Sequence, residues 1–363
     1  MTATVERVAP PLLDGVDGDL VCVAARDETH DVRSLVLRAP GGGLRFDPGQ
    51  YLTLTADVGG VPVSRCYSIS SSPHRPEEVT VTVKRVPGGP LSNHLHDHVR
   101  PGDTVRATGP LGTFSTAHHP AGRVLLLSAG SGITPVVSMA RTLHGSADVA
   151  FVHSARTPAD LAFREELEAL AATDPAFALT LVCGSDPTGT WTGPRGRLTA
   201  DVLRAAVPDV AEREVFVCGP AGYREAVRGM LDGLGADPDR CHEESYVLGP
   251  PATTGVDTGT APTAAGAPAS PAPAAGRTFR VELARSGRVL DCPDGTTVLE
   301  ALATAGVVWP SSCAEGMCGT CKTTLVGGSV DMDHQGGIRP REVADGKILP
   351  CCSTPREDLV LDA

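Results

Sequence analysis

Four cysteines near the end of the chain have the types and spacing to hold a metal cluster. Cys313, Cys318 and Cys321 follow the pattern Cys-x4-Cys-x2-Cys, and 29 residues lie between Cys321 and Cys351. This is the ligand spacing of a [2Fe–2S] cluster, in which three thiolates come from one tight loop. Zinc sites usually show two separate Cys-x2-Cys pairs, whereas this chain has one, so we favour an iron–sulfur centre. Cys351 and Cys352 both remain candidates for the fourth ligand.

Two segments in the first third of the chain have residues that could contact a flavin and its phosphates. The segment Arg65–Ser68 (Arg-Cys-Tyr-Ser) ends a predicted strand. Its arginine can neutralise a pyrophosphate, its tyrosine can lie on an isoalloxazine ring, and its serine can hydrogen-bond flavin N5. The segment Gly88–Asn93 (Gly-Gly-Pro-Leu-Ser-Asn) precedes a predicted short helix, whose free amides can bind phosphate. The alternatives are surface and packing roles for the first segment and an ordinary turn with a serine cap for the second.

Two further loops could bind a nicotinamide nucleotide. The segment Gly130–Pro135 (Gly-Ser-Gly-Ile-Thr-Pro) lies between an apolar strand and a helix, and we expect Pro135 at the first helical position. The helix dipole there favours a phosphate or a carboxamide oxygen. The segment does not meet the Rossmann fingerprint, because proline replaces the last glycine. Cys218 and Gly219 end the last predicted parallel strand, where nucleotide sites of open α/β sheets lie, although a simple strand–helix turn is the alternative.

The positions of these motifs define the domains that must carry them. Residues 250–276 are almost wholly Ala, Pro, Thr and Gly, which predicts a flexible linker. Residues 18–118 contain short alternating strands between turns, which indicates an antiparallel β-barrel. Residues 119–249 alternate strands and helices, which indicates a doubly wound α/β domain with a parallel sheet, and residues 277–363 form a small α+β domain. In the second domain the expected helices are Pro135–Leu143, Pro158–Ala172, Thr199–Ala206 and Ala221–Leu234.

Composition narrows the class of partner. The chain has 363 residues, enough for several domains, and a net charge of −12 with 4% aromatic residues. Such a charge argues against nucleic acid and anionic membrane as partners, and few aromatics argue against single-strand stacking. The longest apolar runs are strand-length, and the first residues lack the apolar core of a signal peptide. We therefore expect a cytoplasmic protein.

Together these motifs resemble the ferredoxin–NADP reductase superfamily, in its oxygenase-reductase form with a C-terminal plant-type [2Fe–2S] ferredoxin domain. The resemblance covers about residues 18–246 and 277–363. It implies an FAD-binding β-barrel over 18–118, an NAD(P)-binding domain over 119–249 and a β-grasp ferredoxin domain over 277–363. The Ser-Asn pair at the phosphate loop implies FAD rather than FMN.

The resemblance also assigns roles to individual residues. The flavin would be held by Arg65, Tyr67 and Ser68 and its pyrophosphate by Gly88, Ser92 and Asn93; the nicotinamide would contact Gly130, Gly132, Thr134, Gly219 and the thiol of Cys218, and Tyr246 would cover the other face of the flavin. Ser68 and Cys218 would lie closest to the reacting atoms. The segment Leu349-Pro350-Cys351 matches the Leu-x-Cys element of ferredoxins, which makes Cys351 the fourth ligand beside Cys313, Cys318 and Cys321.

The implied function is transfer of electrons from NADH or NADPH through FAD and the cluster to a partner oxygenase, of the Rieske type or a haem-thiolate monooxygenase. Arg156 and Arg164 could meet the 2′-phosphate of NADPH, but the resemblance favours NADH, and we expect a monomer. The alternative is an electron-transfer subunit of a stable complex such as dihydroorotate dehydrogenase. Its last cysteine lies closer to the others, so the 29-residue gap weighs against it. A non-catalytic iron–sulfur sensor is a third reading.

Overall fold

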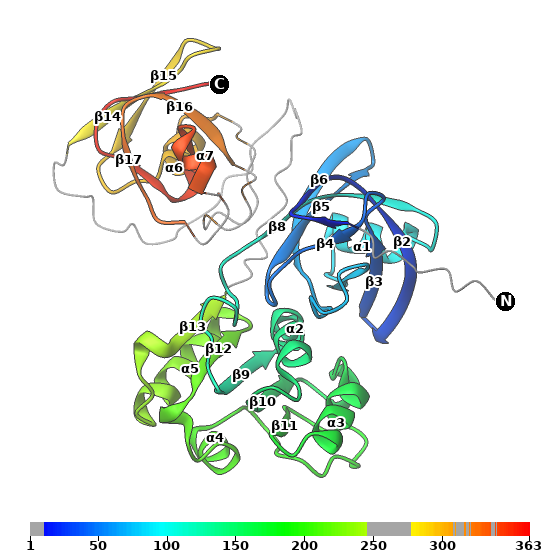
Figure 1. Cartoon of the computed structure of the whole chain (residues 1–363). Helices are drawn as coiled ribbons and strands as arrows, with labels where there is room; N and C mark the ends of the chain where they lie inside the picture. The colour runs from blue at the N-terminus through cyan, green and yellow to red at the C-terminus, as the bar shows by residue number, and fades with distance from the viewer. Residues whose placement is uncertain are drawn as a thin grey trace. The chain divides into compact units, whose positions relative to one another are not determined.

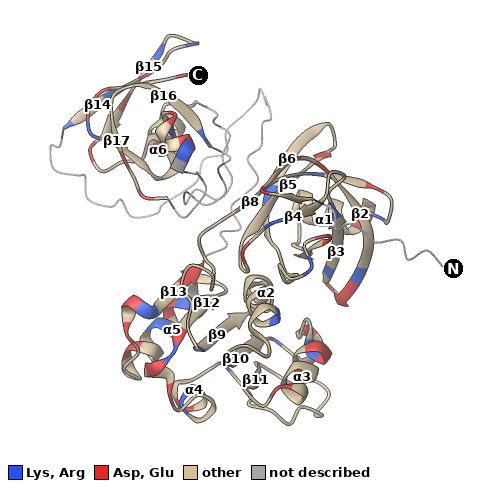
Figure 2. Ribbon diagram, in the orientation of Figure 1, with Lys and Arg blue, Asp and Glu red and all other residues tan. Residues whose placement is uncertain are grey.

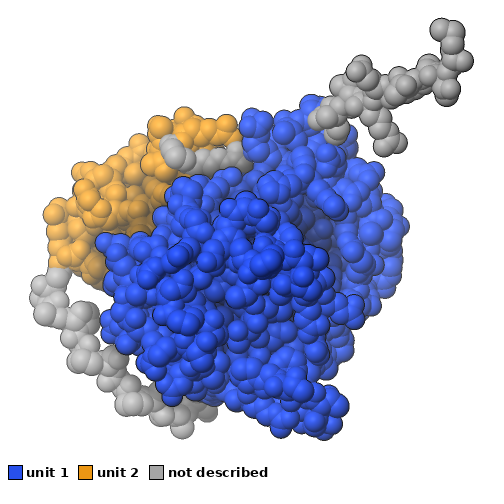
Figure 3. Space-filling view, turned by 60° about the horizontal axis from the view of Figure 1, so that its bottom comes forward, with its two compact units in different colours: residues 1–246 blue, residues 247–363 orange. Residues whose placement is uncertain are grey.

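The computed structural model describes residues 11–244, 277–307, 309, 316, 319, 321–334, 338 and 340–363. The chain divides into two compact units, residues 1–246 and 247–363 (Figure 3). Cys313, Cys318, Tyr246 and the segment 250–276 lie outside the described residues. Among the described helices, none has the length and apolar character needed to cross a bilayer.

The first half of unit 1, blue to cyan in Figure 1, is an antiparallel sheet. Its six strands follow the order β6-β5-β8-β2-β3-β7. An isolated bridge between Ile69 and Val81 joins its two edge strands at one end, as expected for a barrel. Buried residues alternate along the strands, as in β8, so the strands enclose one apolar core. The strands are β2 (Val16–Thr29), β3 (Val32–Arg38), β5 (Tyr51–Val58), β6 (Val61–Ser68), β7 (Val79–Lys84) and β8 (Thr104–Leu111), with the short pair β1 (Leu12–Leu13) and β4 (Gly43–Leu44) and the helix α1 (Pro90–His98).

The second half of unit 1 is a parallel sheet in the order β11-β10-β9-β12-β13. Residues 124–127 of its central strand are all fully buried, because apolar clusters cover both faces of the sheet. The strands are β9 (Arg123–Ala129), β10 (Asp148–Ala155), β11 (Phe177–Cys183), β12 (Glu214–Cys218) and β13 (Cys241–Glu244), and the helices are α2 (Ile133–Leu143), α3 (Arg164–Thr173), α4 (Ala200–Ala206) and α5 (Ala221–Gly233), with the 3₁₀ turns η1 (Gly130–Gly132), η2 (Pro158–Asp160), η3 (Val210–Glu212) and η4 (Pro238–Arg240).

Two helix predictions in this domain were wrong in detail. The single helix expected over Pro158–Ala172 is the turn η2 followed by α3, because Leu161–Phe163 leaves the helical path to enter the core and Phe163 adopts a φ of 58°. Pro135 is the third residue of α2 and not the first, because α2 begins at Ile133 directly after η1.

Unit 2 contains a mixed sheet in the order β15-β14-β20-β16-β18, and helix α6 packs against it. Strands β14 and β15 pair as an antiparallel hairpin, and α6 begins at a capping box in which the hydroxyl of Thr297 accepts from the amide of Glu300. The elements are β14 (Thr278–Leu283), β15 (Arg288–Pro293), α6 (Val298–Thr304), β16 (Thr323–Gly327), β17 (Val330–Met332), α7 (Pro340–Ala344), β18 (Lys347–Ile348), η5 (Pro350–Cys352), β19 (Ser353–Pro355) and β20 (Leu359–Leu361).

Charged side chains of both signs are mixed along the helices of the second domain, which Figure 2 shows clearly for α3 and α5. Many are paired, such as Arg164 with Glu168 and Arg228 with Glu243. Exposed pairs of this kind contribute little to stability, because solvent screens their charges. On these helices the charge is therefore not gathered into a patch of one sign.

Candidate functional site

The end of β6 presents the flavin motif. Arg65 and Tyr67 lie opposite Leu54 and Leu52 of β5, so their side chains share one face of the sheet. The ring of Tyr67 packs against the barrel core, and burial raises the pKa of its phenol, which keeps the ring neutral. Ser68 is buried at the end of the same strand. The motif thus combines a cation with a neutral aromatic ring, the pair needed for a pyrophosphate and a flat ring system.

The glycine loop before α1 is shaped by the two polar residues that follow it. The hydroxyl of Ser92 accepts from the amide of Val86 at 3.1 Å and donates to the carbonyl of Gly89 at 3.2 Å. The side-chain amide of Asn93 donates to the carbonyls of Val86 and Gly89 at 3.0 and 2.7 Å. These side chains fold the loop, and the helix amides that follow are the groups left to bind a phosphate.

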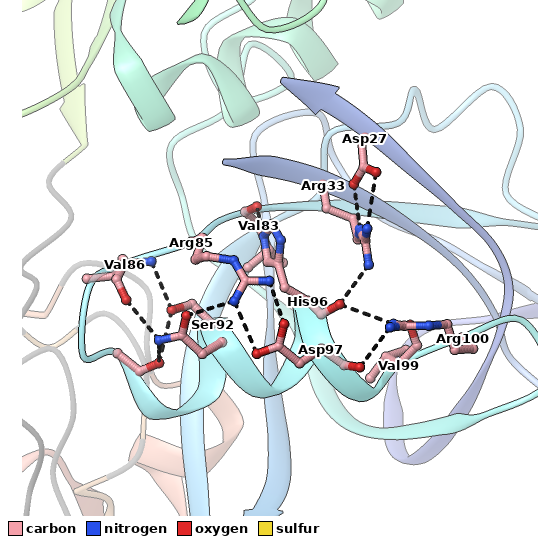
Figure 4. A network of polar contacts seen from close by, with 12 residues as sticks. Asp27, Arg33, Val83, Arg85, Val86, Ser92, His96, Asp97, Val99 and Arg100 are labelled. Carbon is pink, nitrogen blue, oxygen red and sulfur yellow. Dashed lines mark hydrogen bonds and ion pairs between the residues drawn. The ribbon is translucent and has the colours of Figure 1, made fainter. Parts of the chain in front are cut away.

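The other end of α1 is fastened to the barrel by the network in Figure 4. Guanidinium groups of Arg33 and Arg100 donate to the carbonyl of His96 at 2.7 and 3.1 Å, and Arg100 also donates to that of Asp97. Arg85 forms a two-pronged ion pair with Asp97. The carbonyls of His96 and Asp97 in the last turn of α1 therefore have side-chain donors, and the amino end of α1 lies beside the glycine loop. Arg85 was not singled out from the sequence; its position three residues before Gly88 is the signal that could have identified it.

The two nucleotide loops meet through their backbones at the carboxyl edge of the parallel sheet. A Cβ added to Gly132 would lie 2.3 Å from the carbonyl oxygen of Cys218 and 2.7 Å from the amide nitrogen of Gly219. Gly130 has a φ of 54°, and the hydroxyl of Thr134 donates to the carbonyl of Ser131 at 3.1 Å. The structure thus brings the Gly130–Pro135 and Cys218–Gly219 segments together, and only glycine fits at the contact.

A row of buried polar residues lies under these loops. Ser128 pairs in register with His153 on one side and Cys218 on the other, and Cys218 pairs with Glu244. The Ser128 hydroxyl lies 2.8 Å from Nδ1 of His153, and burial lowers the pKa of His153 to about 4, so the imidazole is neutral at pH 7. His153 and Glu244 were not singled out from the sequence; for His153, a polar residue directly after the apolar run 149–152 was the available signal, and for Glu244 the mostly polar strand gave none.

Two of the described cysteines of unit 2, Cys321 and Cys351, lie side by side. Sγ of Cys321 lies 3.2 Å from Sγ of Cys351, and the amide of Gly316 donates to Sγ of Cys351 at 3.2 Å. Sγ of Cys352 instead lies beside Gly316, 2.6 Å from where a Cβ would be, and 3.6 Å from the carbonyl of Leu349. Two thiols side by side with an amide donor to one sulfur fit an iron–sulfur cluster well.

The two arginines considered for NADPH are both paired. Arg156 donates to Asp160 at 3.0 Å and lies 3.6 Å from Asp31. Arg164 donates to Glu168 at 2.7 Å and lies over the ring of Trp191. Each positive charge is therefore already balanced by a neighbouring carboxylate.

Comparison with known proteins agrees with this three-part arrangement. An oxidoreductase FAD-binding domain matches residues 20–116, an oxidoreductase NAD-binding domain matches 126–229, and a 2Fe-2S iron-sulfur cluster binding domain matches 281–356. The glycine betaine monooxygenase reductase subunit of Pseudomonas aeruginosa is 42% identical over 346 residues, covering 94% of each chain. The stachydrine N-demethylase reductase subunit of Rhizobium meliloti is 39% identical over 349 residues, covering 95% of this chain and 96% of that one.

The solved structure of phthalate dioxygenase reductase, described as a modular structure for electron transfer from pyridine nucleotides to [2Fe-2S], covers 95% of this chain and 97% of its own, with a TM-score of 0.56 and 26% identity. The chain belongs to the ferredoxin reductase family, in the group whose members carry a flavin domain, a nicotinamide domain and a C-terminal [2Fe–2S] domain in one polypeptide.

Proposed function

We propose that this protein takes electrons from NADH and passes them through FAD and a [2Fe–2S] cluster to a separate oxygenase component. The observation that carries the proposal is the similarity over 94% of the chain to an oxygenase reductase subunit, which spans all three domains. FAD and the cluster, held by the residues assigned below, would supply the conversion of two-electron transfer from the dinucleotide into single-electron transfer.

The residues of the first unit bind and orient the two organic cofactors. We assign the flavin pyrophosphate to Arg65 and the first amides of α1, and the flavin ring to Tyr67 and Ser68. The nicotinamide belongs at the junction of the Gly130–Thr134 loop and Cys218–Gly219, where the close backbone approach at Gly132 leaves no room for a side chain. We also retain Tyr246 as the residue that covers the second face of the flavin.

In the second unit we assign Cys313, Cys318, Cys321 and Cys351 as cluster ligands. The 3.2 Å separation of the Cys321 and Cys351 sulfurs supports the last two. The linker at 250–276 would join the ferredoxin domain, 277–363, to the reductase domains. We further propose that the protein acts as a monomer in the cytoplasm, without nucleic acid or membrane as partners, in line with its net charge of −12.

We propose NADH over NADPH as the electron donor. Arg156 is the charged residue that follows the second parallel strand; it donates to Asp160 at 3.0 Å and lies 3.6 Å from Asp31, which Lys84 binds at 2.7 Å. A 2′-phosphate at this place would face those carboxylates as well as the guanidinium. The ratio of kcat/KM for NADH to that for NADPH tests this, and a ratio below one would contradict it.

For the partner, we propose an oxygenase of the kind served by the two relatives, which are reductase subunits of a glycine betaine monooxygenase and a stachydrine N-demethylase. The test begins with anaerobic titration by NADH, in which the flavin should bleach and a reduced [2Fe–2S] signal should follow. The reduced protein is then combined with the oxygenase component of the Pseudomonas aeruginosa glycine betaine monooxygenase or with phthalate dioxygenase. Substrate-dependent NADH oxidation should be faster with the first; equal or faster turnover with the second would reject this assignment.

A further inference from the structure

Helix α2 connects the nicotinamide loop to the chain that follows the flavin motif. It begins at Ile133, directly after the Gly130–Gly132 turn, and about 12 Å further along it reaches Arg141. There its polar face meets residues 70–72, which follow β6 and its motif at Arg65–Ser68. One rigid helix therefore spans the distance between the two cofactor elements.

Three hydrogen bonds join α2 to this segment. Arg141 donates through Nη1 to the carbonyl of Ser70 at 2.5 Å, and the hydroxyl of Ser138 donates to the carbonyl of Ser71 at 2.6 Å. The hydroxyls of Thr142 and Ser72 lie 3.2 Å apart. The bond from Arg141 is the charge-assisted one of the three, and such bonds are roughly twice as strong as neutral ones.

The guanidinium of Arg141 is held in one orientation. Its Nε and Nη2 donate to the two carboxylate oxygens of Glu166 at 2.7 and 2.6 Å, and its Cζ lies 4.9 Å from the centroid of the Phe163 ring. Only 20% of the Arg141 side chain is exposed. A planar group fixed by a two-pronged carboxylate and an aromatic face has little freedom left, and lysine cannot reproduce this geometry.

The acceptor on the flavin side is equally rigid. Ser70 is fully buried, its amide donates to the carbonyl of Thr80 at 2.7 Å, and its hydroxyl lies 2.9 Å from that of Thr82. The contact between Arg141 and Ser70 thus joins two fixed groups. We therefore expect a change at this contact to shift α2 relative to the segment that follows the flavin motif.

We propose that Arg141 is a positioning residue that sets the separation between flavin and nicotinamide by fastening α2 to Ser70. The inference rests on the proposed function, because it requires both cofactors at the elements assigned above. Reacting atoms must approach within about 3–3.5 Å, and a misplacement of about 1 Å can reduce a rate on the order of 10²-fold. Arg141 acts through the backbone and needs no contact with either cofactor.

The test is anaerobic rapid-mixing of FAD-loaded protein with NADH. It measures the limiting rate of flavin reduction, the dissociation constant of NADH and the long-wavelength absorbance of the flavin–nicotinamide charge-transfer complex. For Arg141→Met we expect the limiting rate to fall about tenfold to a hundredfold and the charge-transfer absorbance to weaken, while the dissociation constant changes by less than about threefold. Glu166→Gln leaves the hydrogen bond from Arg141 to Ser70 in place, so the limiting rate of flavin reduction should fall less in this variant. The matched control is Arg204→Met, which removes an exposed guanidinium paired with Asp201 on α4 and should behave as wild type.

Two results would overturn the inference: a limiting rate for Arg141→Met within about twofold of wild type, or a loss that lies wholly in NADH affinity. If Arg141→Met does not retain FAD, the limiting rate is measured on Arg141→Lys instead. A single ammonium cannot donate to the carbonyl of Ser70 and to both carboxylate oxygens of Glu166 in the arginine geometry. An unchanged limiting rate in that variant also overturns the inference. If wild-type protein is not reduced by NADH at all, the proposed function fails, and this result is distinct from a wild-type rate that Arg141 does not influence.

Discussion

Replacing Gly132 by alanine should separate the two nucleotide loops. The new methyl group would lie 2.3 Å from the carbonyl oxygen of Cys218, 2.5 Å from its carbonyl carbon and 2.7 Å from the amide nitrogen of Gly219. Non-bonded heavy atoms are best placed near ~3.5 Å, so the backbones must move apart by about 1 Å. Overpacking of this kind costs about 1–3 kcal/mol of unfolding free energy, and a shift of about 1 Å at a reacting centre lowers the rate on the order of 10²-fold.

Both effects can be measured on one preparation. Urea unfolding gives the change in stability, and anaerobic reduction of the flavin by saturating NADH gives the change in rate. Gly229→Ala is the matched control, because Gly229 lies within α5 and a Cβ there would meet no atom within 4 Å. Alanine at a helical position should leave the rate unchanged and raise stability by up to about 1 kcal/mol. A Gly132→Ala protein with the rate and stability of wild type would refute the close approach of the two loops.

Three further predictions follow from the described contacts. Cys351→Ser should abolish the [2Fe–2S] absorbance and electron paramagnetic resonance signals, whereas Cys352→Ser should retain them; loss in both variants would contradict the assignment of Cys351. Burial lowers the pKa of His153 to about 4, so the unfolded chain takes up a proton between about pH 6.5 and 4 that the folded protein does not. The unfolding free energy should therefore be independent of His153 above about pH 6.5 and fall by up to about 3 kcal/mol as the pH drops through this window, and urea unfolding of His153→Gln should lack that part of the pH dependence. Asn93→Ala removes two hydrogen bonds that fold the glycine loop, so the dissociation constant of FAD, measured by equilibrium dialysis, should rise about tenfold; an unchanged constant would show that the loop folds without them.

The sequence was informative wherever a property depends on neighbours along the chain. The alternation of apolar residues predicted the strands of the barrel, and the apolar strand expected before Gly130 is the buried strand β9. The single helix predicted over Pro158–Ala172 was wrong, because Leu161–Phe163 packs into the core instead of continuing the helix. The intrinsic helix propensity of single residues has only a weak effect on backbone conformation, and the burial of three apolar side chains overrides it here. The strand Cys241–Glu244 was missed because three of its four residues are polar, although it pairs with β12 at the sheet edge.

For the candidate site, the residue types and spacing determined by themselves which chemistry the chain can do: thiolates in Cys-x4-Cys-x2-Cys for a cluster, Arg-x-Tyr-Ser for a flavin and glycine loops for a nucleotide. Only the tertiary structure decided which groups meet. It placed Gly132 against the backbone of Cys218, His153 beside Ser128, and Arg141 between Glu166 and the carbonyl of Ser70. It also placed the sulfur of Cys351, rather than that of Cys352, beside Cys321. These contacts join residues distant in the chain, and their distances follow from sheet register and core packing, which no local pattern of residues encodes.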